Sequence, residues 1–267
     1  MNDISIWDNI AKTYDSHTYN EENGSYPANR YRADRVIDFL KTLKPGKILD
    51  AGGGTGYVAA RVAELGWQVY YFDASTAMQQ VAKAATNGQL AGYEQGSIAN
   101  MHCYEDQSFD VVMMNGVLPY LSESEEPAAY REAQRVLKND GYFIAAHYNQ
   151  LFDLMEMDAY TAEFFASVSQ AATTAQTASR LREILSTPES TESRSMKVEN
   201  PLTFTNKLQQ FGFKELKRHY YNFHILPPRI EHTTDNTARA KIELAHHADW
   251  QGIVLARAFF VIAQKGE

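Results

Sequence analysis

The chain has 267 residues, of which 44% are hydrophobic and 22% are charged. This composition suits one globular domain that is long enough to bury a full core. The formal net charge is −8, and an acidic chain is a poor general binder of nucleic acid, because phosphate contacts need clustered Lys and Arg.

The sequence also bears on the compartment of the protein. The N-terminus lacks the basic and apolar regions of a signal peptide, and no apolar run reaches the ~18–20 residues that span a bilayer. Cys103 is the only cysteine, which excludes an intrachain disulfide. We therefore expect a cytoplasmic protein with no membrane partner.

Short apolar runs alternate with helical periods from Lys47 to Tyr148, which is the pattern of a doubly wound, mostly parallel α/β sheet. The run FDVVMM at 109–114 is apolar enough to be buried on both faces of the sheet. In chain order, the predicted elements are a strand at 47–51, a helix at 55–65, a strand at 68–72, a helix from Ser75 to about Thr86, strands at 92–95 and 109–114, a helix at 127–137 and a strand at 141–147.

The alternation stops after residue 150. The amphipathic segment 151–165 predicts a helix, and residues 171–200 predict a further helical part followed by a loop over 187–200. Sheet elements then resume with a helix from Pro201, a strand at 213–223, a helix at 233–247 and a strand at 254–264. We expect a single domain over 1–267, divided into an N-terminal lid (1–30), a cofactor-binding core (31–150), a helical cap insertion (151–200) and the C-terminal part of the sheet (201–267).

A glycine-rich turn, AGGGTG, follows Asp50 at the end of the first predicted strand. Gly52 and Gly54 let the backbone lie against a ligand with no Cβ in the way. Ligands of open parallel sheets bind at this end of the strands. The turn therefore predicts a binding site, although an ordinary glycine-rich turn without a ligand would have the same sequence pattern.

A second acid supports the binding site. Asp73 ends the second predicted strand, 23 residues after Asp50, where a carboxylate can accept hydrogen bonds from both hydroxyls of a ribose. Its alternative role is to balance the dipole of the next helix. The two acids together with the glycine turn predict a nucleoside cofactor.

The spacing of the glycines separates two classes of cofactor. Dinucleotide-binding turns follow the pattern G-x-G-x-x-G, whereas this turn has G-x-G-x-G with Asp50 two residues before it. An acid at that place suits an ammonium group and repels a pyrophosphate. An NAD-dependent oxidoreductase is therefore the less favoured alternative.

This turn resembles the first motif of the class I S-adenosylmethionine-dependent methyltransferases, of the type with a small-molecule acceptor. The resemblance extends from about Ile6 to Lys265 and includes four further segments in the same order. They are WDNIAKTYD at 7–15, FDVV at 109–112 with NGVL at 115–118, RVLKNDGY at 135–142 and FGF at 211–213.

The resemblance implies a cofactor, S-adenosylmethionine, and a role for each matching residue. Asp73 would hold the ribose and Tyr14 would close over the sulfonium. Asp50 would orient the turn or reach the amino group. Many members carry an acid at the place of Ser97, so that the serine hydroxyl or the backbone would hold the adenine amino group here. The implied cofactor-binding residues are Tyr14, Asp50, Ala51, Gly52, Gly54, Asp73, Ala74, Met78, Ser97, Ile98 and Asn115.

Methyl transfer from a sulfonium is an in-line displacement that depends mainly on positioning, and an oxygen acceptor usually also needs a general base. The catalytic candidates are His147, His224 and Tyr14. His147 ends the fifth predicted strand, but it would also suit a buried histidine that is hydrogen-bonded to the backbone. No set of metal ligands is evident, since the adjacent His246 and His247 do not share a helix face.

The acceptor is indicated only weakly. Tyr19, Tyr26, Tyr31 and Tyr148 would line an acceptor pocket or simply pack, and the segment 147–154 resembles methyltransferases of bacterial surface-polysaccharide or sugar biosynthesis. We expect transfer to an oxygen or nitrogen of a small metabolite such as a sugar, enclosed by the lid and the cap. The alternatives are a catalytically silent binding module and a cap segment that mediates homodimer contacts.

Overall fold

The computed structural model describes residues 4–19, 26–158, 160–161, 164, 196–228 and 236–266. Two compact units share the chain. The first comprises Met1–His147, Thr203–Arg218 and Phe260–Glu267, and the second comprises Tyr148–Leu202 and His219–Phe259. Among the helices of the described ranges, none is long and apolar enough to cross a membrane.

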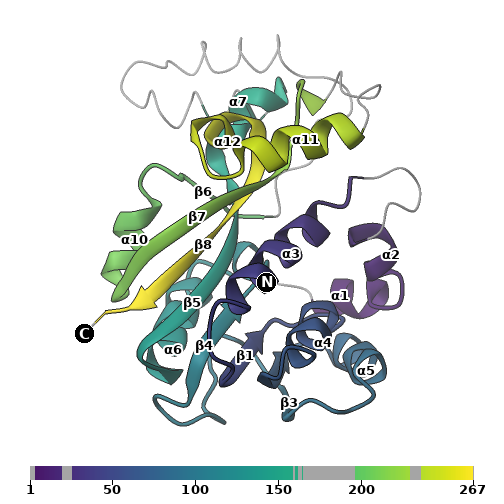
Figure 1. Ribbon diagram of the computed structural model, residues 1–267, viewed down its shortest axis with the longest axis vertical. Coiled ribbons are helices and arrows are strands. Elements are labelled where there is room, and N and C mark those ends of the chain that lie inside the picture. The colour runs from purple at the N-terminus through teal and green to yellow at the C-terminus, as the bar shows by residue number, and fades with distance from the viewer. Residues whose placement is uncertain are drawn as a thin grey trace. The chain divides into compact units, whose positions relative to one another are not determined.

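The central sheet has the strand order β3-β2-β1-β4-β5-β8-β7, and the short β6 pairs with β5 (Figure 1). The pairs β1–β2, β1–β4, β2–β3 and β4–β5 are parallel, which confirms the predicted doubly wound sheet. The strands are β1 (Lys47–Ala51), β2 (Gln68–Asp73), β3 (Gly92–Gln95), β4 (Phe109–Met114), β5 (Leu137–Asn149), β6 (Val198–Glu199), β7 (Phe213–Phe223) and β8 (Ala256–Lys265).

The last strand runs opposite to β5. Lys265 at the end of β8 donates from Nζ to the carbonyl of Leu137 at the start of β5 (2.8 Å), and Asn149 at the end of β5 donates to the carbonyl of Ala256 at the start of β8 (2.8 Å). β7 in turn runs opposite to β8, since Gly266 bonds to Gly212 just before β7. The sheet is therefore parallel in its cofactor half and antiparallel at this edge.

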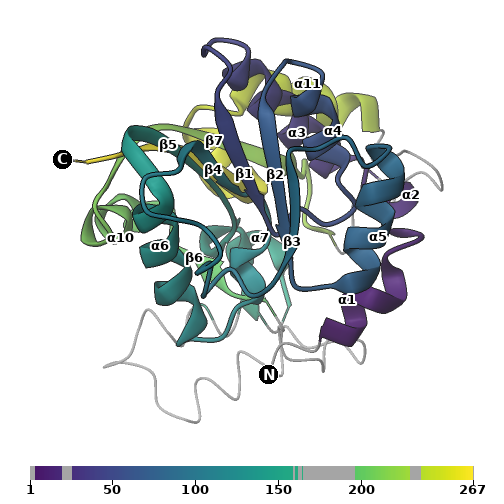
Figure 2. The same ribbon diagram turned by 90° about the horizontal axis from the view of Figure 1, so that it is seen from below.

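Helices of the first unit cover both faces of its part of the sheet. In Figure 2, α3, α4 and α5 stand on one side of the strands and α6 and α10 on the other. The helices of this unit are α1 (Ile4–Ile10), α2 (Tyr14–Thr18), α3 (Ala28–Leu40), α4 (Tyr57–Ala63), α5 (Thr76–Ala85), the 3₁₀ turn η2 (Leu118–Tyr120), α6 (Glu125–Val136) and α10 (Phe204–Gln210). The second unit contains η3 (Gln150–Phe152), α7 (Asp153–Glu156), α11 (Asn236–His246) and α12 (Trp250–Leu255).

Capping side chains explain two of the differences from the predicted bounds, whereas β5 extends beyond the predicted strand at 141–147 at both ends. Ser75 caps α5 as predicted, accepting a hydrogen bond from the Met78 amide (3.0 Å). The predicted strand at 254–264 begins too early, because Asp249 caps α12 and residues 254–255 complete that helix. α6 begins at Glu125, two residues before the prediction, because Ser122 and Glu125 form a reciprocal capping box.

The predicted cap insertion is described only at its two ends. Of the predicted helix over 151–165, the structure describes the short helices η3 and α7, and it describes residues 160–161 and 164 as helical again. Met157 ends α7 in a left-handed conformation (φ 57°). Residues 165–195 lie outside the described residues, so that the cap stays a prediction.

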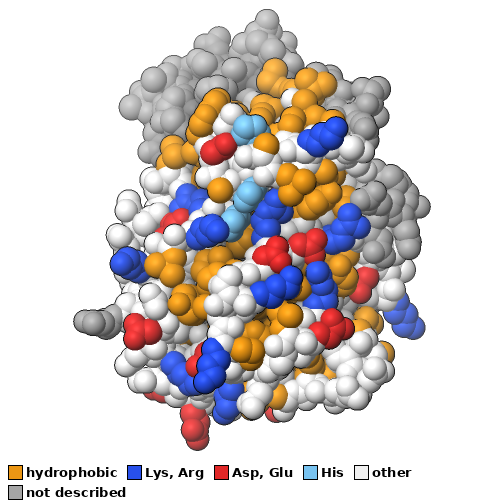
Figure 3. Space-filling view, in the orientation of Figure 1, with side chains coloured by type: hydrophobic (Ala, Val, Ile, Leu, Met, Phe, Trp, Pro, Cys, Tyr) orange, Lys and Arg blue, Asp and Glu red, His pale blue; other side chains and the backbone are white. Residues whose placement is uncertain are grey.

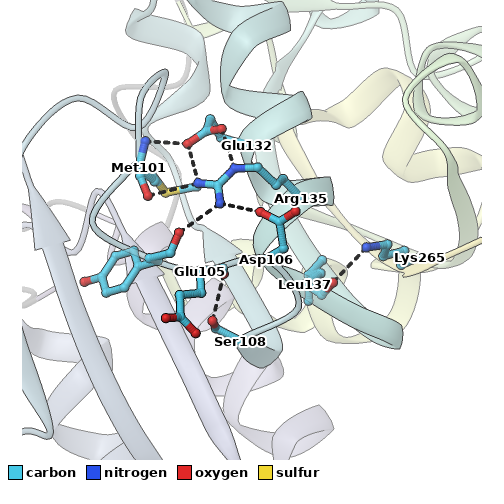
Figure 4. A network of polar contacts seen from close by, with 9 residues as sticks. Met101, Glu105, Asp106, Ser108, Glu132, Arg135, Leu137 and Lys265 are labelled. Atoms are coloured by element: carbon cyan, nitrogen blue, oxygen red, sulfur yellow. Dashed lines mark hydrogen bonds and ion pairs between the residues drawn. The ribbon is translucent and has the colours of Figure 1, made fainter.

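One guanidinium fastens the loop between β3 and β4 to α6 (Figure 4). Arg135 donates to the carbonyls of Tyr104 (2.8 Å) and Met101 (3.0 Å), and Glu132 holds the guanidinium from the previous turn of the helix (2.8 Å). Glu132 also accepts the Met101 amide (2.5 Å). Because Ser97 belongs to this loop, the network supports one wall of the site described next.

Candidate cofactor site

A cavity of about 190 Å³ opens in the first unit, where β1, β2 and β4 end. Its walls are the glycine turn after β1, the end of β2, and the segments that follow β3 and β4, and α1 and α2 also contribute to it. The lining residues include Trp7, Tyr14, Tyr19, Arg32, Asp50, Gly52, Gly53, Gly54, Thr55, Asp73, Ala74, Ser75, Met78, Ser97, Ile98, Asn115, Val117, Tyr120, Leu121 and Glu125.

The turn after β1 depends on glycine at one position above all. Gly52 has φ +80°, and a Cβ there would lie 2.6 Å from the Cβ of Val117. The Gly52 amide donates to the carbonyl of Phe72 in β2 (2.7 Å), which holds the turn close to the neighbouring strand. Tyr71 donates from its hydroxyl to the Gly54 carbonyl (2.6 Å). The chain is therefore packed tightly behind the turn and open in front of it.

Asp73 is held by two backbone amides. Its Oδ2 accepts from Gly54 (2.9 Å) and its Oδ1 accepts from Ser75 (2.8 Å). Burial raises the pKa of Asp73, and these hydrogen bonds oppose the rise. The carboxylate thus joins the glycine turn to the start of α5, which agrees with its alternative role at the N-terminus of that helix. It also lines the cavity.

Asp50 is a buried carboxylate, 2% exposed, in the penultimate position of β1. Within the described residues, its Oδ2 has no hydrogen-bond donor. Burial, together with the charge of Asp73, raises the pKa of Asp50 to about 7, and Arg32 opposes this rise. A ligand with an ammonium group would supply the donor that this oxygen lacks.

Arg32 is a site residue that the sequence analysis missed. It is 5% exposed and lines the cavity from α3, where Val36 and Leu40 follow at intervals of four on the same buried face. Its guanidinium lies against Gly116, since a Cβ there would be 2.9 Å from Nη1. The available signal was an arginine at helical spacing from the apolar residues Val36 and Leu40. Guanidinium and carboxylate together suit a zwitterionic ligand.

Aromatic rings from α1, α2 and η2 line the cavity as well. Trp7 packs edge-on against Tyr120, with centroids 4.8 Å apart, and Tyr14 lies 6.3 Å from both Trp7 and Tyr19. Tyr19 stacks on Tyr57 of α4 at 3.9 Å. Two other predicted aromatic residues do not line the cavity: Tyr26 and Tyr31 stack on each other at 5.3 Å. Tyr148 belongs to the second unit.

The structure brings most of the predicted cofactor residues to this one cavity. They are Tyr14, Asp50, Gly52, Gly54, Asp73, Ala74, Met78, Ser97, Ile98 and Asn115. Ala51 is not among the lining residues, because its side chain is fully buried at the end of β1. The amide oxygen and nitrogen of Asn115 are both buried without a partner among the described residues, which leaves them for a ligand.

His147 lies elsewhere. Its ring packs against Phe204 of α10 with centroids 4.6 Å apart, and its Nε2 is 3.1 Å from the hydroxyl of Tyr130 in α6. Burial, with a smaller effect of Lys207, lowers the pKa of His147 to about 3. It does not line the cavity, because this position of β5 turns its side chain towards the helices. His147 is thus buried, as in the alternative, although its printed hydrogen-bond partner is the Tyr130 side chain and not the backbone. Its role as a general base stays a prediction.

His224 belongs to the second unit and is also not among the lining residues. Its ring contacts Phe152, with centroids 5.0 Å apart, and its Nε2 is 3.3 Å from the guanidinium of Arg239. Of the three catalytic candidates, Tyr14 alone lines the cavity. Over the part of the chain that the structure describes, no group of His, Cys, Asp and Glu side chains is arranged to hold a metal ion.

Comparison with known proteins gives the same fold over nearly the whole chain. A methyltransferase from Archaeoglobus fulgidus, described as dependent on S-adenosylmethionine, is 15% identical with a TM-score of 0.55, covering 94% of this chain and 97% of its own. A chain from a complex of Haloferax volcanii, which joins the Trm112 methyltransferase activator to a methyltransferase, is 14% identical with a TM-score of 0.59 and coverages of 99% and 96%. Magnesium protoporphyrin IX methyltransferase from Synechocystis, solved with bound S-adenosylhomocysteine, is 14% identical with a TM-score of 0.56 and coverages of 89% and 83%.

The strand order, the glycine turn and the acid that ends β2 are those expected from the class I S-adenosylmethionine-dependent methyltransferases, whose fold this chain has. Residues 49–145, which contain most of the site, match the family described as Methyltransferase domain. The cofactor that this likeness implies is S-adenosylmethionine. The donors and acceptors of the cavity fit it, since Asp50 lacks the partner that an ammonium would provide.

Proposed function

We propose that this methyltransferase acts on an oxygen or nitrogen of a small metabolite, and that the acceptor is a sugar or sugar derivative. The observation that supports a small acceptor is the set of aromatic rings from α1 and α2 that line the cavity beside the proposed position of the cofactor. Basic and acidic side chains are interspersed on the face shown in Figure 3, which is a poor match for a nucleic acid. The assignment of a sugar acceptor rests on the resemblance of residues 147–154 to methyltransferases of sugar biosynthesis.

We further propose how the cavity holds the cofactor. Asp73 binds the ribose hydroxyls, while Asp50 and Arg32 bind the ammonium and carboxylate of the methionine part. This assignment follows from charge, because a buried acid and a buried guanidinium line the same cavity. Ala74, Met78 and Ile98 flank the adenine, Ser97 lies at its edge, and Asn115 faces the methionine end.

The bound cofactor supplies an activated methyl group on its sulfonium, so that the work of the protein is to align an acceptor with it. Tyr14 is the predicted catalytic residue that lines the cavity, and we propose that its hydroxyl contacts the acceptor. Glu125 also lines the cavity, but its Oε2 accepts from the amide (2.9 Å) and hydroxyl (2.6 Å) of Ser122 in the capping box. That engagement favours a structural role for Glu125.

A product screen tests the proposal. The full chain is incubated with methyl-labelled S-adenosylmethionine and a panel of sugars, amino sugars and sugar nucleotides, with non-sugar amines and phenols as the comparison set. Mass spectrometry should find label on members of the sugar set. Label confined to the comparison set would overturn the sugar assignment. Binding of S-adenosylhomocysteine with no labelled product from a broad metabolite extract would instead support the silent-module alternative.

A further inference from the structure

An aromatic–aspartate pair occurs twice in the N-terminal segment, as Trp7-Asp8 and Tyr14-Asp15. The aromatic member of each pair lines the cavity. The aspartate of each pair reaches a hydroxyl that also lines it, on a residue of the cofactor-binding loops. The two pairs lie seven residues apart, and each aspartate is hydrogen-bonded to a different wall of the cavity.

Asp8 joins α1 to the wall formed by the start of α5. Its Oδ1 accepts from the hydroxyl of Ser75 (2.5 Å) and from the amide of Ala77 (3.2 Å). Ser75 is the N-cap of α5 and is 1% exposed. Its own amide bonds to Asp73. The contact therefore connects α1 directly to the loop that presents the ribose-binding carboxylate.

Asp15 joins α2 to the glycine turn. Its Oδ1 accepts from the hydroxyl of Thr55 (2.5 Å), which is 2% exposed and follows Gly54 in the turn. Burial raises the pKa of Asp15, and the hydrogen bond to Thr55 opposes that rise. This second contact lies at the other loop that the cofactor must touch.

Apolar packing holds α1 only weakly. No residue of α1 is fully buried, and Ile4 and Ile6 are 44% and 57% exposed. The position of Trp7 over the cavity must therefore depend strongly on specific polar contacts. Hydrogen bonds to a carboxylate are stronger than those between neutral groups, and they are directional.

We infer that Asp8 and Asp15 are positioning residues that hold Trp7 and Tyr14 over the bound cofactor and set the rate at which S-adenosylhomocysteine leaves. The inference rests on the proposed placement of the cofactor beneath these rings. Each carboxylate fastens one aromatic ring to one loop, so that the product is released only after these hydrogen bonds break. They do not contact the reacting atoms themselves.

The test compares Asp8→Ala and Asp15→Ala with Asp38→Ala, a matched control in which an exposed aspartate of α3 loses an ion pair with Lys41. S-adenosylhomocysteine is chased from each protein with excess S-adenosylmethionine in a stopped-flow instrument. The loss of one hydrogen bond to a carboxylate should speed dissociation about 10-fold. The control should keep the wild-type rate.

Further variants separate positioning from general stability. Asp8→Asn and Asp15→Asn keep an acceptor oxygen and should dissociate at intermediate rates. Thr55→Val removes the hydroxyl that Asp15 uses, and it should add nothing to Asp15→Ala in a double variant. Melting temperatures without ligand should stay close to that of the wild type.

Dissociation rates within about twofold of the control for both alanine variants would overturn the inference. So would a rate increase matched by an equal loss of stability in the ligand-free protein. Failure of the proposed cofactor placement is distinguishable, because the wild-type protein would then show no saturable binding of S-adenosylhomocysteine. The identity of the acceptor does not enter this test.

Discussion

Asp73→Ala removes the acceptor of two backbone amides as well as the proposed ribose ligand. Gly54 and Ser75 donate to the carboxylate at 2.9 and 2.8 Å. A hydrogen bond to a charged group contributes about 1.5–3 kcal/mol, and partial access of water reduces the sum. We expect a loss of about 2–4 kcal/mol in the free energy of unfolding. The affinity for S-adenosylhomocysteine should fall by a further ~1–3 kcal/mol, because the ribose hydroxyls lose a charged partner.

Urea denaturation measures the first quantity and isothermal titration calorimetry the second, at a temperature where the variant is folded. Asp73→Asn is the matched control, since its amide oxygen replaces one acceptor and its NH₂ group cannot replace the other. This variant should lose less stability than the alanine variant and still bind weakly. A stability loss with unchanged affinity would refute the ribose assignment and leave only the link between the turn and α5. Unchanged stability would show that the two amides find other partners.

Three further predictions follow from the site. Burial raises the pKa of Asp50 to about 7, so that the protonated carboxyl stabilises the ligand-free fold at low pH and this contribution is lost as pH rises through 7. Asp50→Asn should flatten this decline in melting temperature, and a wild-type protein that gains stability between pH 5 and 8 would contradict the assignment. Gly52→Ala should abolish cofactor binding, because its Cβ would clash with Val117. The Cβ of Gly54→Ala meets no atom within 4 Å, so this control should lose only ~1 kcal/mol of unfolding free energy, because its backbone is left-handed. His147→Ala should lower the unfolding free energy by about 1–3 kcal/mol and leave turnover nearly unchanged, and a 100-fold loss of turnover in a stable variant would restore the general-base prediction.

The sequence predicted the strands of the cofactor half well, because each is a short apolar run whose ends are marked by local signals. β1 and β4 have the predicted bounds, and β2 extends one residue further to include Asp73. β5 is an exception, since it begins four residues before and ends two residues after the predicted strand at 141–147. Side-chain caps explain two other differences. Asp249 caps a helix that includes Val254, which was predicted to lie in the strand. The cap provides an acceptor for a backbone amide at the start of the helix, so the helix is stable there.

The residues of the candidate site likewise fall into those that the sequence predicted and those that it did not. Asp50, the glycine turn and Asp73 were predictable, because the turn and the two strand ends lie within one short stretch of chain and the sheet places parallel strand ends together. Arg32, Trp7 and Tyr120 were not predicted as site residues, since each comes from a different segment and reaches the cavity only through packing.

The sequence by itself thus determined the class of fold and the place of a nucleoside site, because glycine backbones and strand-end carboxylates act through local geometry. The tertiary structure alone decided which buried titratable side chains face the cavity and which face the helices. His147 and Asp50 both lie near the ends of buried strands, yet one packs beneath α6 and α10 and the other lines the cavity. The reason is physical: successive side chains of a strand point to opposite faces, and what covers each face depends on helices that are distant in the chain.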